Sequence, residues 1–379
     1  MKKFVWILIL IILIMTIKGF SQGLSFKGQL SAWGVTKPFD NFESQLGARY
    51  IPELYYGYTF KEKYTLDAEV QLNMYGYMYY NGDSVKWDGQ FDLFRGWVRF
   101  SSNTFNLRVG LQKISFGSAA MLRPLMWFDQ IDPRDPLQLT DGVYSILGQY
   151  YFANNANIWF WLLYGNDTRK GWELFPSVKK IPEFGGRFQT PLFTGELALS
   201  YHHRVANTQN ELIPELQSPG EAAENRIGLD GKWDVGVGLW FETAFIHQDI
   251  DVPEFRAKKM INIGMDYTIG VGNGLMLMAE QLWFTSGEEF FNSTQSNSFT
   301  AISANYPVSI IDNLTYIFYY DWSNNGVYNF INWGMTWDRI NLYVMAYWNP
   351  DRFNLYQNLS EEVTLYTGKG FQVQFVFNH

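Results

Sequence analysis

Segments in which apolar and polar side chains alternate recur along almost the whole chain, and this pattern constrains the fold more than any other feature. Clear examples lie at 63–80, 257–270 and 367–377, where aliphatic or aromatic residues take every second position. The positions between them hold acids, amides or glycines. A period of two places successive side chains on opposite faces of a β-strand. The chain is therefore predicted to be all-β, built from strands with one apolar and one polar face.

The connections between the predicted strands alternate between short and long. We expect about 18 strands, from 24–33 to 367–377, and 16 if one weak hairpin is misread. Tight turns such as 101–104 are rich in residues that turns require. The expected long connections are 34–46, 81–87, 116–141, 166–182, 206–223, 250–256, 286–295 and 350–366. This alternation is typical of a transmembrane up-and-down antiparallel β-barrel with short periplasmic turns and long extracellular loops.

Composition agrees with a membrane barrel. Aromatic residues make up 18% of the chain and charged residues 17%. When apolar residues occupy only every second position, the hydropathy averaged over a strand stays moderate. Searches for long apolar segments therefore do not detect membrane barrels. Backbone groups cannot stay unpaired in lipid, so such a sheet must close on itself. The absence of cysteine excludes a disulfide framework, and the net charge of −8 argues against a nucleic-acid partner.

Residues 1–22 have the layout of a cleaved secretory signal peptide. Lys2 and Lys3 precede an apolar run from Phe4 to Ile17, and a polar, small-residue stretch follows. A membrane-anchoring helix is the alternative, but the apolar run is shorter than the ~20 residues that span a bilayer. We therefore expect residues 23–379 to form the barrel, located in a cell outer membrane of the Gram-negative type.

The alternating pattern stops between 116 and 141, directly after a strand predicted at 105–115. Pro124, Pro133 and Pro136 exclude a helix interior or a central strand in this stretch. Residues 121–128 are too apolar for a loop surrounded by water, and a connection of this length without secondary structure indicates a function. We predict that 116–141 folds into the lumen and narrows it as a constriction loop.

Charged residues of the loop and of the strands before it are the candidates for the pore constriction. The fourth and fifth strands are predicted to point three arginines inward, and the loop adds charges of both signs. Opposed charges at a constriction would set ion preference or bind anionic groups in transit. Alternatively, the arginines only attach the loop to the wall through carboxylates, and the two roles are compatible. The candidates are Arg95, Arg99, Arg108, Arg123, Asp129, Asp132, Arg134 and Asp135.

No catalytic residue, metal site or cofactor is expected. The spacing of Asp129, Asp132 and Asp135 suggests calcium, but the prolines and the missing glycine and glutamate of a calcium loop oppose it. His202 and His203 would face opposite sides of a strand and cannot chelate one metal together. A barrel-embedded lipase or protease would need a nucleophile elbow of the Gly-x-Ser-x-Gly type, which the sequence lacks.

The strand and loop around 108–142 resemble those of porin-like outer-membrane channels, including the alginate-export group. The resemblance lies in an arginine, glycine and glutamine on one strand, an aromatic-glycine pair at its end, and an aspartate-glycine pair before the next strand. These residues are Arg108, Gly110, Gln112, Phe116, Gly117, Asp141 and Gly142. The resemblance implies a passive, often homotrimeric channel with an inward-folded loop after the fifth strand.

These observations predict an outer-membrane porin that lets small hydrophilic solutes, including anions, diffuse through a water-filled lumen. Its partners would be the lipid bilayer and the solutes. The alternatives are export of a polysaccharide, an enzyme embedded in the barrel, and an adhesion or assembly scaffold. A continuous arginine track through the lumen would favour export of a polyanion, and a local ring of opposed charges would favour a porin.

Overall fold

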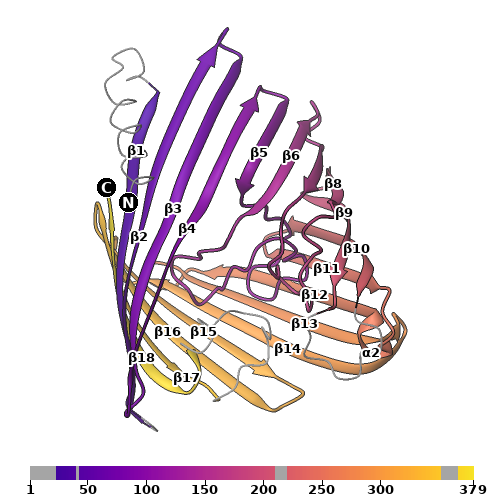
Figure 1. Cartoon of the computed structure of the whole chain (residues 1–379). Helices are drawn as coiled ribbons and strands as arrows, with labels where there is room; N and C mark the ends of the chain where they lie inside the picture. Colours follow the sequence, from indigo (N-terminus) through magenta and orange to yellow (C-terminus); the bar gives the residue numbers. More distant parts are fainter. Residues whose placement is uncertain (1–22, 40–41, 210–219, 351–365) are drawn as a thin grey trace.

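The computed structural model describes residues 23–39, 42–209, 220–350 and 366–379, and it is built almost entirely of β-strands (Figure 1). The predicted signal peptide at 1–22 lies outside the described residues. In the ranges described, no helix is both long enough and apolar enough to cross a membrane.

The described residues form 18 strands, as the alternating pattern predicted, and one short helix, α2. The strands are β1 Leu24–Lys37, β2 Glu43–Phe60, β3 Tyr64–Tyr80, β4 Val85–Ser101, β5 Phe105–Gln112, β6 Val143–Tyr151, β7 Asn157–Leu163, β8 Glu183–Leu192, β9 Gly195–Asn207, β10 Glu221–Asp234, β11 Gly238–Gln248, β12 Ala257–Ile269, β13 Leu275–Glu289, β14 Asn292–Pro307, β15 Asp312–Asp321, β16 Gly326–Thr336, β17 Ile340–Trp348 and β18 Lys369–Asn378, with α2 at Pro253–Arg256.

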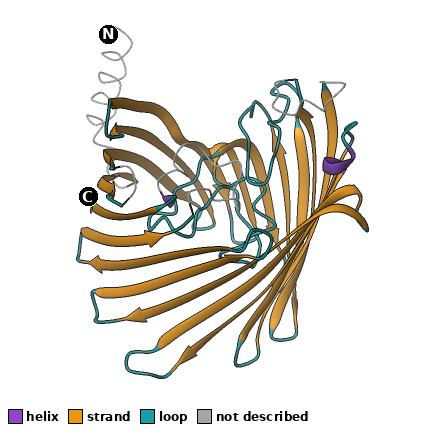
Figure 2. Cartoon of the chain, turned by 90° about the horizontal axis from the view of Figure 1, so that it is seen from below, coloured by secondary structure: helices purple, strands orange, loops and turns teal. Residues whose placement is uncertain are grey.

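The sheet closes on itself, which confirms the predicted antiparallel barrel. Each strand pairs antiparallel with the next, and β1 pairs with β18 from Gln29↔Asn378 to Thr36↔Phe371. Figure 2 shows the strands surrounding a set of loops. Every described strand has a neighbour on both sides, so the sheet has no edge strand, as a barrel in lipid requires. β4 pairs with β5 only over its last residues, Gly96–Ser101, and before them it pairs with β3 alone.

The two faces of the strands differ as the sequence predicted. On β10, Ile227 is 50% exposed on the outer surface, whereas its neighbour Arg226 is 2% exposed inside. On β18, Phe371, Val373 and Phe375 face outward, and the glutamines between them are buried. The outside is therefore an apolar surface with the alternation expected of a lipid-facing wall.

Several predicted long loops are shorter than expected because the strands extend further. The connection predicted at 286–295 is a turn at 290–291, and those predicted at 34–46 and 81–87 are reduced to 38–42 and 81–84. The residues of β4 from Val85 to Leu93 are exposed, and polar residues are common among them. Apolar residues still take every second position here, at Val85, Trp87, Phe91 and Leu93, so the alternation continues to Val85 and the sequence prediction started this strand three residues too late.

Candidate functional site: the loop-lined lumen

The connection between β5 and β6 turns back into the barrel, as Figures 1 and 2 show. The strand before it ends at Gln112, earlier than predicted. The apolar part of the loop is buried, with Leu122 at 0%, Leu125 at 1% and Trp127 at 1% exposure. These side chains pack in one cluster with inward-facing wall residues that include Met260 of β12 and Leu282 of β13. The inward fold of the loop thus rests on apolar burial inside the barrel.

Two glutamates of the wall hold the backbone of the loop. The Glu280 carboxylate on β13 accepts hydrogen bonds from the backbone N–H groups of Ala120, Met121 and Leu122, at 2.7, 3.1 and 2.6 Å. Glu242 on β11 accepts from two further loop amides, those of Ala119 and Leu125. Two wall side chains thus supply the acceptors for five backbone donors of the loop.

The loop also makes close approaches that only glycine allows. Gly117 has a φ of +103°, and a Cβ at this position would collide with the Glu242 carboxylate. Asn262 of β12 completes the attachment by donating from Nδ2 to the Leu122 carbonyl at 2.7 Å. The aromatic-glycine pair noted in the sequence is therefore the point at which the chain bends toward the wall.

These contacts correct two sequence-based expectations. The polar faces of the strands were expected to line a water-filled lumen, but Asn262 and Glu242 are each 0% exposed beneath the loop. Wall arginines were expected to attach the loop through carboxylates, whereas here wall carboxylates bind its backbone amides. Sequence reasoning missed Glu242 and Glu280; acids at inward positions of otherwise apolar strands were the available signal.

Within the loop, the predicted charges pair mainly with each other. Arg123 donates through Nη1 and Nη2 to both carboxylate oxygens of Asp129, at 2.8 and 3.1 Å. Arg134 donates through Nε and Nη2 to the two carboxylate oxygens of Asp132, at 2.8 and 2.6 Å. Both arginines are largely buried, so their planar guanidinium groups brace the fold of the loop.

Asp135 caps the turn that follows these pairs. Its carboxylate accepts hydrogen bonds from the backbone N–H groups of Leu137 and Leu139, at 3.0 and 3.2 Å. Burial raises the pKa of Asp135 to about 6, although these two bonds and the charge of Arg49 on β2 act in the opposite direction. This carboxyl group therefore titrates within an accessible pH range.

The three wall arginines lie on the strands before the loop, Arg95 and Arg99 on β4 and Arg108 on β5. Arg99 of β4 and Arg108 of β5 stand directly opposite each other in the register. Arg99 is neutralised by a bidentate pair with Asp67 of β3. Both guanidinium groups also lie over the ring of Trp97, at 5.4 and 4.6 Å from its centroid. The acid and the ring explain how two like charges can share one site.

Arg95 is the one predicted wall arginine that reaches the loop. Its Nη2 donates to the backbone carbonyl of Thr140 at 2.6 Å, which holds the end of the loop against β4. The eight predicted residues therefore form separate groups: two arginine–aspartate pairs in the loop, the Asp135 cap, the Arg99–Arg108 site, and the Arg95 contact. The described ion pairs of Asp129 and Asp132 join them to arginines of the loop.

A second loop, between β7 and β8, also folds onto the inner wall, through a buried ionic network. Glu173 of this loop pairs with Arg226 of β10 at 2.8 Å and with Arg204 of β9 at 3.4 Å. Lys170 pairs with Glu183 of β8 at 3.1 Å. The sequence analysis did not identify this network, because charges spaced along separate strands give no sign of sharing one site.

The inner face of β1–β5 is different, since its polar side chains are mostly half-exposed. Gln71 of β3 donates to Glu53 of β2 at 2.8 Å, and both residues are partly exposed. Arg49 of β2 lies over the rings of Trp33 and Tyr75, at 5.7 and 5.0 Å. We call this inner surface of β1–β5 the polar wall.

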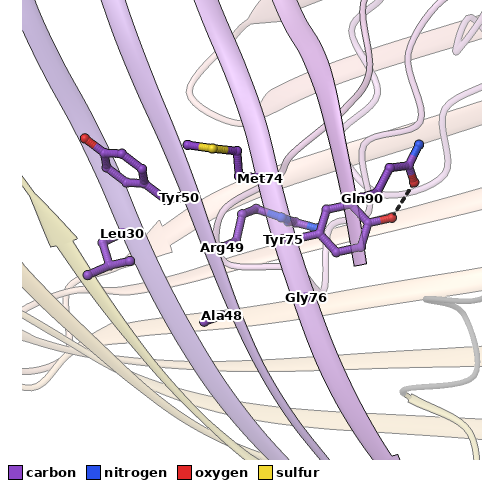
Figure 3. A pocket seen from close by; sticks show the side chains of 8 residues that line it. All are labelled: Leu30, Ala48, Arg49, Tyr50, Met74, Tyr75, Gly76 and Gln90. Atoms are coloured by element: carbon purple, nitrogen blue, oxygen red, sulfur yellow. Dashed lines mark hydrogen bonds between the residues drawn. The ribbon is translucent and has the colours of Figure 1, made fainter. Parts of the chain in front are cut away.

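Figure 3 shows both sides of the barrel wall at this point. Arg49 and Tyr75 lie on the inner side, where the Tyr75 hydroxyl donates to Gln90 at 2.8 Å. A hollow of about 280 Å³ lies here, and its lining combines these residues with Leu30, Ala48, Tyr50, Met74 and Gly76.

Comparison with known proteins gives a fold but no sequence family. No family model matches the chain, and no curated protein matches it. Solved structures do match. OccAB1 of Acinetobacter baumannii is 11% identical with a TM-score of 0.56, covering 94% of this chain and 95% of that one. OccK5 (OpdH) of Pseudomonas aeruginosa is 11% identical with a TM-score of 0.56, covering 95% and 98%.

A third match is the trimer form of OmpT, an outer membrane protein of Vibrio cholerae, folded in vitro. It is 10% identical with a TM-score of 0.53, covering 94% of this chain and 99% of that one. At such identities the likeness establishes the fold alone. The predicted resemblance to porin-like outer-membrane barrels is confirmed at that level.

Proposed function

We propose that this protein is an outer-membrane porin through which small hydrophilic solutes diffuse passively. The passage would run along the polar wall, opposite the part of the lumen that the β5–β6 loop fills. In this proposal the chain is exported with a cleaved signal peptide at 1–22, and the short turns lie on the periplasmic side.

The observation that carries the proposal is the contrast between the two halves of the inner surface. Met260 and Leu282 are each 0% exposed beneath the loop. Gln71, Tyr75 and Arg108 on the polar wall keep part of their surface accessible. A polar, accessible inner wall inside an apolar outer wall is what a water-filled barrel requires. The loop would narrow the passage as a constriction, with Arg95 and the Arg99–Arg108 site beside it.

We expect at most a slight preference for anions. Arg49 and Arg108 contribute positive charge to the polar wall, but Glu53 and Glu69 lie on the same face of the strands. Arg99 is already neutralised by Asp67. A wall of mixed sign supports weak selectivity, because fixed charges at a constriction decide ion preference.

Export of a polyanion is less well supported by the described residues. A continuous arginine track would need exposed guanidinium groups along the lumen. Arg187, Arg204 and Arg226 are instead buried, and each pairs with a carboxylate. An enzyme would need a free base near the surface, but His202 is 0% exposed and contacts Trp161 and Glu183 through its two ring nitrogens.

Recording in planar bilayers tests the proposal. Purified full-length protein should give stepwise conductance, with reversal potentials in a salt gradient that lie close to zero or slightly toward anions. A variant with Arg49→Gln and Arg108→Gln should shift the reversal potential toward cations. Membranes that stay silent at all protein concentrations would reject the porin proposal.

A further inference from the structure

A polar cluster interrupts the apolar outer surface near the loop-bearing ends of β9–β12. It consists of His203 on β9, Asn225 on β10, His247 on β11 and Lys259 on β12. Apolar residues such as Ile227 and Ile263 lie two and four positions further along these strands, at 50% and 49% exposure. Side chains of this kind on a lipid-facing wall are costly away from the interfaces and call for a functional explanation.

The strand register brings these residues together. His203 stands opposite Asn225, and Asn225 stands opposite His247. Lys259 stands opposite Phe245, which places it diagonally beside His247. With strands ~4.8 Å apart, the four residues fall within roughly 15 Å across the outer wall. This is a single surface rather than a set of scattered polar positions.

Hydrogen bonds orient the donors of the cluster. Asn225 Oδ1 accepts from the Tyr201 hydroxyl at 2.7 Å and from His203 Nδ1 at 2.9 Å. With its oxygen used in this way, Asn225 directs an NH₂ group with two hydrogens elsewhere, and none of the described hydrogen bonds uses that group. With Asn225 Oδ1 as the acceptor, Nδ1 is the donor nitrogen of the His203 ring in this bond.

Aromatic residues of the turn between β13 and β14 border the cationic end of the cluster. The Lys259 ammonium lies 5.1 Å from the ring centroid of Phe291, which is 90% exposed. Phe290 contacts the rings of Phe245 and His247, at 5.6 and 6.4 Å. An exposed aromatic turn beside a lysine is typical of the level at which lipid headgroups meet acyl chains.

We propose that this cluster binds the phosphate headgroup of a lipid in the outer leaflet. Lys259 would supply the positive charge, and the Asn225 amide with the two imidazoles would supply polar contacts. Charge-assisted bonds to phosphate oxygens are strong, and the aromatic turn would lie against the acyl chains. The proposal rests on the proposed function only in its placement of the barrel in the outer membrane.

Native mass spectrometry of the purified full-length chain in neutral detergent tests the proposal. Phosphatidic acid, diacylglycerol with the same acyl chains, and inorganic phosphate are the three probes. Wild-type protein should retain phosphatidic acid and release diacylglycerol. The variant with Lys259→Gln and Asn225→Leu should lose at least about tenfold in retention, as expected when charged hydrogen bonds are removed.

Lys369→Gln provides the matched control, since Lys369 lies at the loop-bearing end of β18 but pairs there with Trp348. Retention by this control should equal that of the wild type. Equal retention by the cluster variant would overturn the proposal, as would binding of inorganic phosphate as tight as that of the lipid. Lipid retention is measured independently of conductance. An absence of conductance would therefore reject the porin proposal, and an absence of lipid retention would reject the lipid-binding proposal.

Discussion

Val70 and Gln71 are neighbours on β3 but contact different surroundings. Val70 is 47% exposed on the outer wall, whereas Gln71 points inward and donates to Glu53. The same division separates Ile227 from Arg226 on β10. At the scale of single residues, the side chain at a strand position follows from whether it faces the apolar outside or the polar inside of the barrel. Intrinsic strand propensity explains it less well.

Val70→Arg should therefore destabilise the folded barrel by ~2–4 kcal/mol, the cost of a cation on the lipid face near the bilayer centre. Gln71→Arg should change stability much less, because its charge would enter the polar wall. Denaturant titrations of folding into vesicles measure both values. Equal losses would show that the facing of β3 is assigned incorrectly.

Glu280 allows a second test at this scale. Replacing it with glutamine leaves one acceptor oxygen for the amides of Ala120, Met121 and Leu122. Leaving a buried amide unpaired costs about 1–3 kcal/mol, so these amides should exchange their hydrogens faster. Hydrogen exchange with mass spectrometry reports the change. Glu62→Gln in an exposed turn is the control, and unaltered protection in Glu280→Gln would contradict the anchoring role.

At the scale of elements, the β5–β6 loop is an internal layer rather than a flexible connection. Its apolar residues share a cluster with the walls of β12 and β13, and its amides bind wall carboxylates. The sequence predicted that this segment lies inside, because its composition was too apolar for water. It could not predict the partners, since Glu242 and Glu280 are more than a hundred residues away along the chain.

Deleting residues 120–135 should raise single-channel conductance, because the deletion removes the buried segment that occupies the lumen. Circular dichroism should show that the variant keeps its strand content. Conductance equal to that of the wild type, in a folded variant, would mean that the loop does not limit the passage.

Asp135 makes the packing of the β5–β6 loop sensitive to pH. Its pKa in the folded loop is about 6, above the ordinary 3.8, so the neutral carboxyl group favours the packed loop. This contribution is fully present below pH ~4 and is lost as the pH rises through about 6. Amides of 132–141 should exchange hydrogen faster at pH 7 than at pH 4, after correction for intrinsic rates, and Asp135→Asn should reduce that difference. An identical pH response in the variant would exclude Asp135 as the source.

At the scale of the whole molecule, the sequence predicted the barrel and its strand number but not the division of its interior. Alternation is a local property, so all 18 strands could be predicted from short stretches. The ionic network around Glu173 depends on contacts between segments that are far apart in the sequence. The eight candidate constriction residues lie on β4, on β5 and in the β5–β6 loop, and their pairing follows from packing that no spacing in the sequence encodes.

The most direct test of the account places single cysteines on the three kinds of surface, in a chain that has none of its own. The variants are Gln71→Cys on the polar wall, Val70→Cys on the outer wall, and Asn262→Cys beneath the loop. A cationic methanethiosulfonate reagent is added during single-channel recording. We expect a stepwise fall in conductance with Gln71→Cys and no change with the other two. A fall with Asn262→Cys and none with Gln71→Cys would place the water on the other side of the barrel and contradict the account.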